Sequence, residues 1–305
     1  GDEVIVPSLT FCASVQVISA LGARPVFCEI NPDNLNMDVS DVKKRITRKT
    51  KAIMPVHYCG QACDMDALIE IGKNHNVFII EDAAHAFGSS YKGRKIGSFG
   101  NATCFSFDPI KNLTCGEGGA VVLSDDAIAE LIGTKRILGI DKDTWHRYRN
   151  ERAWFYEVTT QGYRYHMSNI NAAIGIVQLT KFESFIQRKK EIVQKYNDAF
   201  MHIDGLKNLS WNLKETAPFA YIIRVLNGAR EDMIAFLKEK GIGTGIHYIP
   251  NHLQPFFASF ATSLPVTEQI GEEILTLPLY NDMTDQDVEL VIQSVAEFFM
   301  RSKNG

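Results

Sequence analysis

Long apolar runs are missing from this chain of 305 residues. A membrane-spanning helix needs about 20 consecutive apolar residues; no stretch approaches that length, and no signal-peptide pattern is visible. An excess of basic charge is missing too, because 36 acidic residues outnumber 32 basic ones and leave a net charge of −4. Nucleic-acid surfaces normally carry a basic excess. The composition therefore argues against membrane and nucleic-acid partners.

Paired cysteines and common nucleotide-binding motifs are also lacking. Six cysteines are scattered through apolar stretches without a Cys-x-x-Cys pair, so we expect neither a disulfide framework nor a metal site. Small buried thiols of this kind are typical of a reducing, cytoplasmic setting. There is no Gly-x-Gly-x-x-Gly and no Walker lysine, which argues against an ordinary nucleotide-binding sheet.

What the first half does contain is an alternation of short apolar strands and helix-like segments. The expected strands are Val4–Pro7, Pro25–Ile30, Ala52–Val56, Val77–Glu81, Thr103–Phe107 and Ala120–Leu123, with helices at Met65–Asn74 and Ala127–Arg136. Such alternation indicates an α/β fold whose mostly parallel sheet carries helices on both faces.

The second half predicts a smaller α/β domain. A helix is expected from Ser168, a suitable N-cap, and we place the boundary on it, giving a large domain of residues 1–180 and a small one of 181–305. A strand at Tyr221–Val225, a helix at Met233–Lys240 and a closing amphipathic helix over residues 285–301 follow. The aromatic and basic stretch 141–165 is irregular and long enough to suggest a functional role.

Three chemically useful side chains stand where predicted strands end. Asp82 and His85 follow Val77–Glu81, and Lys111 follows the strand that ends near Ser106 and Phe107. Open α/β sheets bind ligands at such ends. An amine, a carboxylate, an imidazole and a hydroxyl suit pyridoxal 5'-phosphate, which needs a lysine for its aldehyde and a carboxylate beside its pyridine nitrogen.

Five blocks, in order along the chain, resemble the DegT/DnrJ/EryC1/StrS family of nucleotide-sugar aminotransferases, which use pyridoxal phosphate. They are Gly1–Ser8, Glu81–Ala86, Ser106–Gly119, Gly162–Met167 and Gly243–Tyr248. The resemblance implies a type I pyridoxal-phosphate transferase fold. It also implies that Lys111 is the Schiff-base lysine and proton carrier, that Asp82 faces the pyridine nitrogen, and that His85 lies near the ring or its 3'-oxygen.

Other roles are implied for cofactor binding. Phe11 matches the family's stacking aromatic, and Ser106 a phosphate ligand. Arg164 stands where the family usually has an asparagine that reaches the phosphate of the neighbouring subunit; arginine can make a bidentate contact to the phosphate instead, or pair with a substrate diphosphate or donor carboxylate. Asp108 and Ile110 replace the more usual histidine or asparagine and threonine.

Substrate contacts are implied for two aromatic pairs, His57 with Tyr58 and His247 with Tyr248. The expected reaction moves an amino group from glutamate to a nucleotide-linked keto-sugar for deoxyamino-sugar or polysaccharide synthesis, in a cytoplasmic homodimer with shared sites. The block His57–Gly60 favours a 4-keto-6-deoxy acceptor. The cationic stretch 147–152 suits either a diphosphate contact or an exposed surface.

Two alternatives stay open at this point. Another type I aminotransferase would hold the substrate carboxylate with an arginine of the small domain, for which Arg224 and Arg230 are available. A non-catalytic or inactive relative is the other alternative. The family normally carries a phosphate-binding turn ahead of the Gly1–Ser8 block, and without it we expect weaker cofactor binding.

Overall fold

The computed structural model describes residues 1–140 and 156–302. Its larger sheet contains β1 (Glu3–Pro7), β2 (Arg24–Cys28), β3 (Thr50–Ile53), β4 (Phe78–Asp82), β7 (Ala102–Ser106) and β8 (Gly119–Leu123), in the order β2-β1-β3-β4-β7-β8. All neighbours pair in parallel except β8, which runs antiparallel to β7. The mostly parallel sheet is confirmed. The β7–β8 connection, residues 107–118, holds no helix and returns the chain beside β7, which makes β8 antiparallel.

Helices cover both faces of this sheet, as expected. Side chains alternate along a strand, so the neighbours Ile5 and Val6 of β1 point to opposite faces. Val6 packs with Val15 of α1 (Cys12–Ala20), whereas Ile5 packs with the α2 (Val39–Arg45) and α3 (Met65–His75) side. α4 (Asp126–Lys135) follows β8, while η1 (Tyr58–Gly60), β5 (Ser90–Tyr91) and β6 (Arg94–Lys95) lie in connections.

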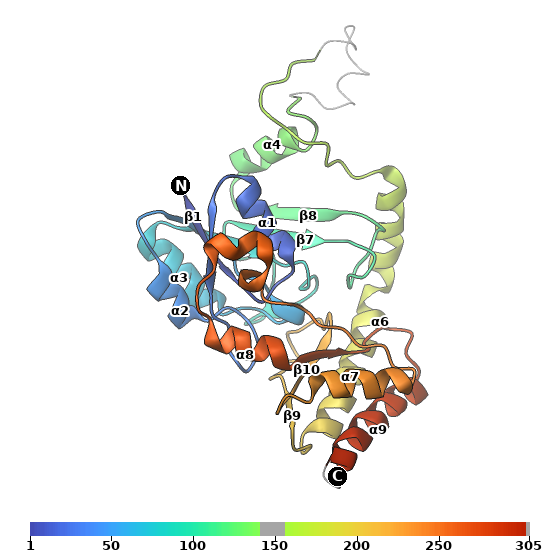
Figure 1. Ribbon diagram of the computed structural model, residues 1–305. Coiled ribbons are helices and arrows are strands. Elements are labelled where there is room, and N and C mark those ends of the chain that lie inside the picture. The colour runs from blue at the N-terminus through green and yellow to red at the C-terminus, as the bar shows by residue number, and fades with distance from the viewer. Residues whose placement is uncertain (141–155, 303–305) are drawn as a thin grey trace.

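One long helix joins the two parts of the molecule. α6 (Asn169–Phe200) has 32 residues and begins at the expected N-cap, where the Ser168 hydroxyl accepts from the Asn171 amide at 3.1 Å. It runs from the main sheet down to a smaller sheet (Figure 1). The expected boundary at residues 180 and 181 falls inside this helix, and it stays a prediction.

The smaller sheet is antiparallel, in the order β11-β10-β9, from β9 (Leu206–Asn208), β10 (Tyr221–Val225) and β11 (Ile274–Leu277). Around it lie α7 (Arg230–Glu239), α8 (Pro265–Glu273) and α9 (Asp285–Ser302), whereas η2 (Asn251–Leu253) and η3 (Pro255–Phe260) pack against the larger sheet near β1 and β2. α9 buries Val288, Val291, Val295 and Phe299 against the second half of α6, which confirms the apolar face expected for this helix. Among the described residues, no helix is both long and apolar enough to cross a membrane.

Candidate active site

A cavity of about 410 Å³ lies where the parallel strands end. Seven of the residues expected in the site line it: Phe11, Asp82, His85, Ser106, Lys111, His247 and Tyr248. Asp82 and Ser106 are the last residues of β4 and β7, and Phe11 immediately precedes α1. The fold thus gathers residues up to 237 positions apart at the carboxyl edge of one sheet, where α/β proteins place ligands.

The Asp82 carboxylate is held by two donors. Ser14 of α1 donates its hydroxyl to Oδ2 at 2.6 Å, and the Ala84 amide donates to Oδ1 at 3.0 Å. Both oxygens of this carboxylate therefore accept a hydrogen bond, and the two contacts fix its direction. Ser14 was not found by the sequence analysis, although its position on the first turn of the helix after Phe11 was a usable signal.

Lys111 lies in the β7–β8 connection with its ammonium beside the Phe219 ring, 4.6 Å from the centroid. Burial lowers its pKa below the usual value, and the nearby carboxylates of Asp82 and Asp108 oppose part of that effect. A lysine with a lowered pKa supplies more neutral amine, which is the nucleophilic form. Asp108 also accepts the Ile110 amide at 3.0 Å, so it shapes the turn that presents Lys111.

His85 has one ring nitrogen without a partner. Its ring stacks on Phe219 at 4.0 Å, and Nε2 meets the Tyr248 hydroxyl at 3.1 Å. Nδ1 is buried and has no hydrogen-bond partner within the described structure. Burial, then the charges of Lys111 and His247, hold the pKa of His85 well below its usual value. A neutral imidazole with a spare nitrogen in the cavity wall suits a ligand oxygen, because buried polar atoms are rarely left unpaired.

Two aromatic rings, those of Phe11 and Tyr248, line the cavity, and a third, that of Phe219, packs against His85 and Lys111. Phe11 is 53% exposed, so it is not an ordinary core residue, and its ring lies 5.6 Å from that of Tyr248. Phe219, which no sequence pattern pointed to, is fixed because its amide donates to the Cys59 carbonyl at 3.0 Å. Ser106 accepts from the Asp108 amide at 3.3 Å and remains at the cavity wall.

His57 and Tyr58 are not cavity residues, which corrects the sequence-based expectation. His57 is fully buried; its Nε2 donates to Glu81 at 2.9 Å, and its Nδ1 accepts the Cys63 amide at 3.1 Å. Tyr58 is also buried, and its hydroxyl donates to the carbonyl of His247. With both imidazole nitrogens satisfied inside the protein, His57 has none left for a sugar. Both residues instead hold neighbours of the cavity in place: His57 through Glu81, which precedes Asp82, and Tyr58 through His247.

Arg164 lies outside this cavity, exposed and bridged through its backbone to Ile137. Its expected contact crosses to a neighbouring subunit, so it stays a prediction. The cationic stretch 147–152 falls outside the described residues. No three potential metal ligands lie together within the part of the chain that the structure describes.

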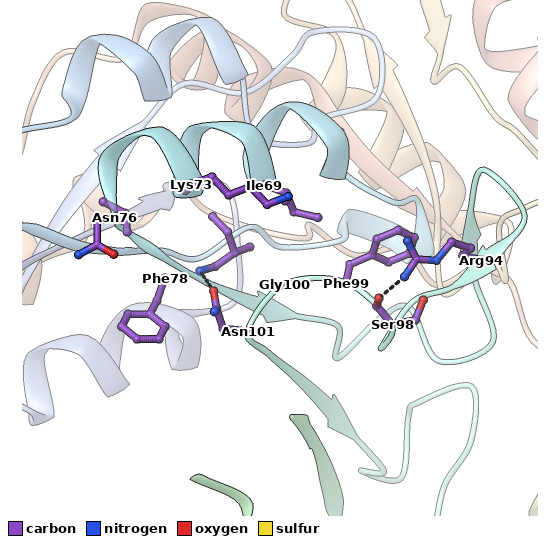
Figure 2. Close-up of a pocket in the computed structure, with 12 residues that line it drawn as sticks. Ile69, Lys73, Asn76, Phe78, Arg94, Ser98, Phe99, Gly100 and Asn101 are labelled. Carbon is purple, nitrogen blue, oxygen red and sulfur yellow. Dashed lines mark hydrogen bonds between the residues drawn. The ribbon is translucent and has the colours of Figure 1, made fainter. Parts of the chain in front are cut away.

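A cavity of about 430 Å³ lies at the other end of β4, near Phe78, between α3 and the loop before β7 (Figure 2). Two of its polar groups are already used: Asn101 accepts the Ile79 amide at 2.8 Å, and Arg94 donates to the Ser98 carbonyl at 2.6 Å. Because ligands of parallel sheets bind at the carboxyl ends of strands, this cavity is not the active site.

Comparison with known proteins decides between the possible chemistries. The model of the DegT/DnrJ/EryC1/StrS aminotransferase family matches residues 1–296. The chain belongs to this family. It is 41% identical to the uncharacterized protein MJ1066 of Methanocaldococcus jannaschii, over 99% of this chain and 81% of that protein. It is 38% identical to the spore coat polysaccharide biosynthesis protein SpsC of Bacillus subtilis, over 97% and 79%.

Solved structures agree with the family. Spr1654 of Streptococcus pneumoniae, assigned as a sugar aminotransferase and solved in its PLP-form, superposes with a TM-score of 0.89 at 31% identity, covering 99% of this chain and 81% of that one. The protein is therefore a sugar aminotransferase that depends on pyridoxal phosphate, with the type I fold. The cavity fits that cofactor, because it offers an amine of lowered pKa, a doubly held carboxylate and the unpaired Nδ1 of His85.

Proposed function

We propose that this enzyme transfers the amino group of glutamate to a nucleotide-linked keto-sugar, with a 4-keto-6-deoxy sugar as the favoured acceptor. The observation that carries the proposal is the shared cavity of Lys111, Asp82 and His85. SpsC, a relative, is named for polysaccharide biosynthesis, which supports an amino sugar destined for a polysaccharide. His247, kept neutral because burial and Lys111 lower its pKa, and Tyr248 are proposed to contact the sugar hydroxyls.

Each cavity residue has a proposed task. Pyridoxal phosphate, when bound, supplies an aldehyde for the amine and a ring that accepts electrons. Lys111 Nζ is the covalent attachment point and, once released, moves the proton of the donor. Asp82 holds the proton of the ring nitrogen, and the spare His85 nitrogen bonds a ring oxygen. Phe11 covers the ring face, and Ser106 bonds the phosphate.

A homodimer with shared sites is also part of the proposal. The first half of α6, the preceding segment and β8 expose many apolar side chains: Val121, Val122, Tyr163, Tyr165, Met167, Ile170, Ile174, Ile176, Val177 and Leu179. Three of them, Val121, Tyr165 and Met167, line a hollow of about 890 Å³ formed by β8, α4 and the segment that leads into α6. Apolar surface of this extent marks protein interfaces. A second copy bound there would bring its Arg164 toward the phosphate.

The proposed location is the cytoplasm. Six free cysteines support a reducing compartment of this kind.

An amino-acid aminotransferase is the weaker hypothesis, because it needs an arginine that can bind the substrate carboxylate, and both candidate arginines are already engaged. Arg224 is buried in β10 and paired with Glu273 at 2.6 Å, and it donates to the Pro32 carbonyl. Arg230 donates to Glu231 and to the Gly271 carbonyl. Neither side chain is available to hold a substrate carboxylate.

The test combines covalent labelling with a substrate panel. The protein is mixed with pyridoxal phosphate, reduced with borohydride and digested, and the labelled peptide is mapped; we expect the label on Lys111. The holoenzyme is then given glutamate with nucleotide-linked 3-keto and 4-keto sugars, and the aminated product is detected by mass spectrometry. Labelling of another lysine, or turnover of amino acids without any keto-sugar, would overturn the proposal.

A further inference from the structure

A cavity of about 490 Å³ adjoins the active site. Ile110, Lys111 and His247 line both cavities, so both are bounded by the reactive amine. The second cavity extends away from Asp82, between the β7–β8 connection, the middle of α6 and the segment that follows β11. A ligand in the second cavity would therefore lie next to Lys111.

Lys189 of α6 is the unusual group in this second cavity. Its side chain is only 7% exposed, and its ammonium donates to one neutral acceptor, Asn112 Oδ1, at 2.9 Å. Asn112 is itself held by the Ala217 carbonyl at 3.1 Å. In the part of the chain that the structure describes, Lys189 forms no ion pair. Burial alone lowers its pKa to about 8.

Two other cations of the same helix are balanced by a carboxylate. Arg188 and Lys195 both pair with Asp285 at 2.9 Å. A buried ammonium without a counter-ion is costly, and proteins normally pair such charges or use them to bind an anion. The anion that would balance Lys189 is therefore expected to come from a ligand.

We propose that the second cavity is the subsite for the amino donor and that Lys189 binds the side-chain carboxylate of glutamate. This inference rests on the proposed function. Apart from the reactive Lys111, the cavity holds one buried cation among neutral polar residues such as Asn112, Thr114, Gln178 and Asn281, which matches a single carboxylate. A sugar diphosphate carries more negative charge and is ordinarily held by several cations or by bidentate arginines. The second cavity also begins at Lys111, where the donor's amino group must arrive.

The subsite predicts a strong preference for glutamate over glutamine, which has the same shape without the side-chain charge. In Lys189→Met the second-order rate constant for glutamate in the first half-reaction should fall about 100-fold, as is typical when a buried charge pair loses one partner. The constant for glutamine should change little. The half-reaction of the keto-sugar with the aminated enzyme should also stay near the wild-type rate.

Two further variants separate binding from folding. Lys189→Arg keeps the charge and should retain most of the preference for glutamate. Lys190→Met changes the neighbouring lysine, which does not line the cavity, and should behave as wild type. Cofactor absorbance and thermal unfolding establish that each variant is folded. If Lys189→Met does not fold, Lys189→Gln takes its place with the same expected result.

Binding of glutarate, a non-reactive dicarboxylate, gives a readout without turnover. Calorimetry with the holoenzyme should show saturable binding that Lys189→Met weakens at least about 10-fold. A variant that keeps both the glutamate preference and glutarate binding would overturn the subsite. Equal losses with glutamate and glutamine would also overturn it, because they indicate a purely structural lysine. A wild type that aminates no keto-sugar but still discriminates glutamate from glutamine would overturn the proposed acceptor and leave the subsite standing.

Discussion

The Ser14 hydroxyl lies 2.6 Å from Asp82 Oδ2 and ties the first turn of α1 to the end of β4. Thr10 continues the contact, since its hydroxyl lies 3.1 Å from that of Ser14. The aspartate is therefore positioned by the helix that follows β1 as well as by its own strand. Hydrogen bonds to a charged group contribute about 1.5–3 kcal/mol, enough to keep this carboxylate in one orientation.

Asp82→Asn should retain the covalent cofactor yet lose turnover. The amide cannot supply the negative charge that we assign to the ring nitrogen, and loss of one such electrostatic contact typically costs about 100- to 1,000-fold in rate. Steady-state kcat with glutamate and a keto-sugar measures the effect, with the cofactor absorbance as a check on binding. Ser14→Ala should cost much less, because the Ala84 amide still holds the carboxylate. Near-normal kcat in Asp82→Asn would contradict the assignment.

His57→Leu should destabilise the fold rather than weaken sugar binding. It leaves the buried Glu81 carboxylate with only the Thr103 hydroxyl, at 2.7 Å. Removing a hydrogen-bond donor from a buried charged group costs about 3 kcal/mol, measurable as the free energy of unfolding in urea. The double variant His57→Leu/Glu81→Gln should recover part of the loss, since no charge is left unpaired. An unchanged stability with a raised KM for the keto-sugar would restore His57 to the sugar pocket.

Acid should destabilise the protein partly through His85. Its folded pKa is lowered by burial and by Lys111 and His247, so below about pH 6.5 the unfolded chain binds a proton that the folded chain refuses. Stability is therefore lost as the pH falls from 6.5 toward the folded pKa. The difference in melting temperature between pH 7.5 and 5.5 should shrink in His85→Gln. It should stay as in wild type in His75→Gln, which changes an exposed histidine; equal differences in all three proteins would refute the prediction.

Charges on the apolar stripe of α6 should separate the two copies. Ile170 and Val177 are 75% and 52% exposed and lie seven residues apart, on one side of the helix. Ile170→Asp/Val177→Asp should sediment as a monomer and bind pyridoxal phosphate more weakly, because the partner's Arg164 is lost from the phosphate. Leu290→Asp serves as the control, because Leu290 is exposed on α9, which packs beside the smaller sheet. This variant should sediment as wild type. A monomer that still transaminates at the wild-type rate would refute shared sites.

Local patterns in the sequence were sufficient for most of the fold. The strand Tyr221–Val225 and the Ser168 cap were predicted to the residue, because an apolar run and an N-cap serine are local signals. The antiparallel direction of β8 was not predicted, since it depends on how the Lys111 loop folds back. The antiparallel pairing within the smaller sheet also depends on how the connections between its strands fold. It could therefore not be inferred from the sequence of each strand alone.

The candidate site shows a similar limit. Residues that end strands, such as Asp82 and Ser106, were placed correctly because parallel strands end at one edge. His57 also follows a strand, but its partner Glu81 is 24 positions away, and no pattern joins them. A signal did exist: Glu81 and Asp82 are consecutive on a strand and must point to opposite sides. If one faces the cavity, the other is buried and needs a donor. Phe219 had no comparable signal.

In the proposed homodimer, the continuous helix α6 would make the choice of amino donor depend on how the two copies fit together. About 48 Å long by its rise per residue, it exposes its first turns, lines the second cavity with Lys189 in its middle turns, and ends in the core of the smaller domain. Lys111, in contrast, is carried by the main sheet. The distance between Lys111 and Lys189, which must match the length of the proposed donor, therefore depends on where α6 lies against the main sheet. If Lys189 binds the donor as proposed, a change in contact at the exposed end of α6 would alter this distance and, with it, which amino acid the enzyme accepts.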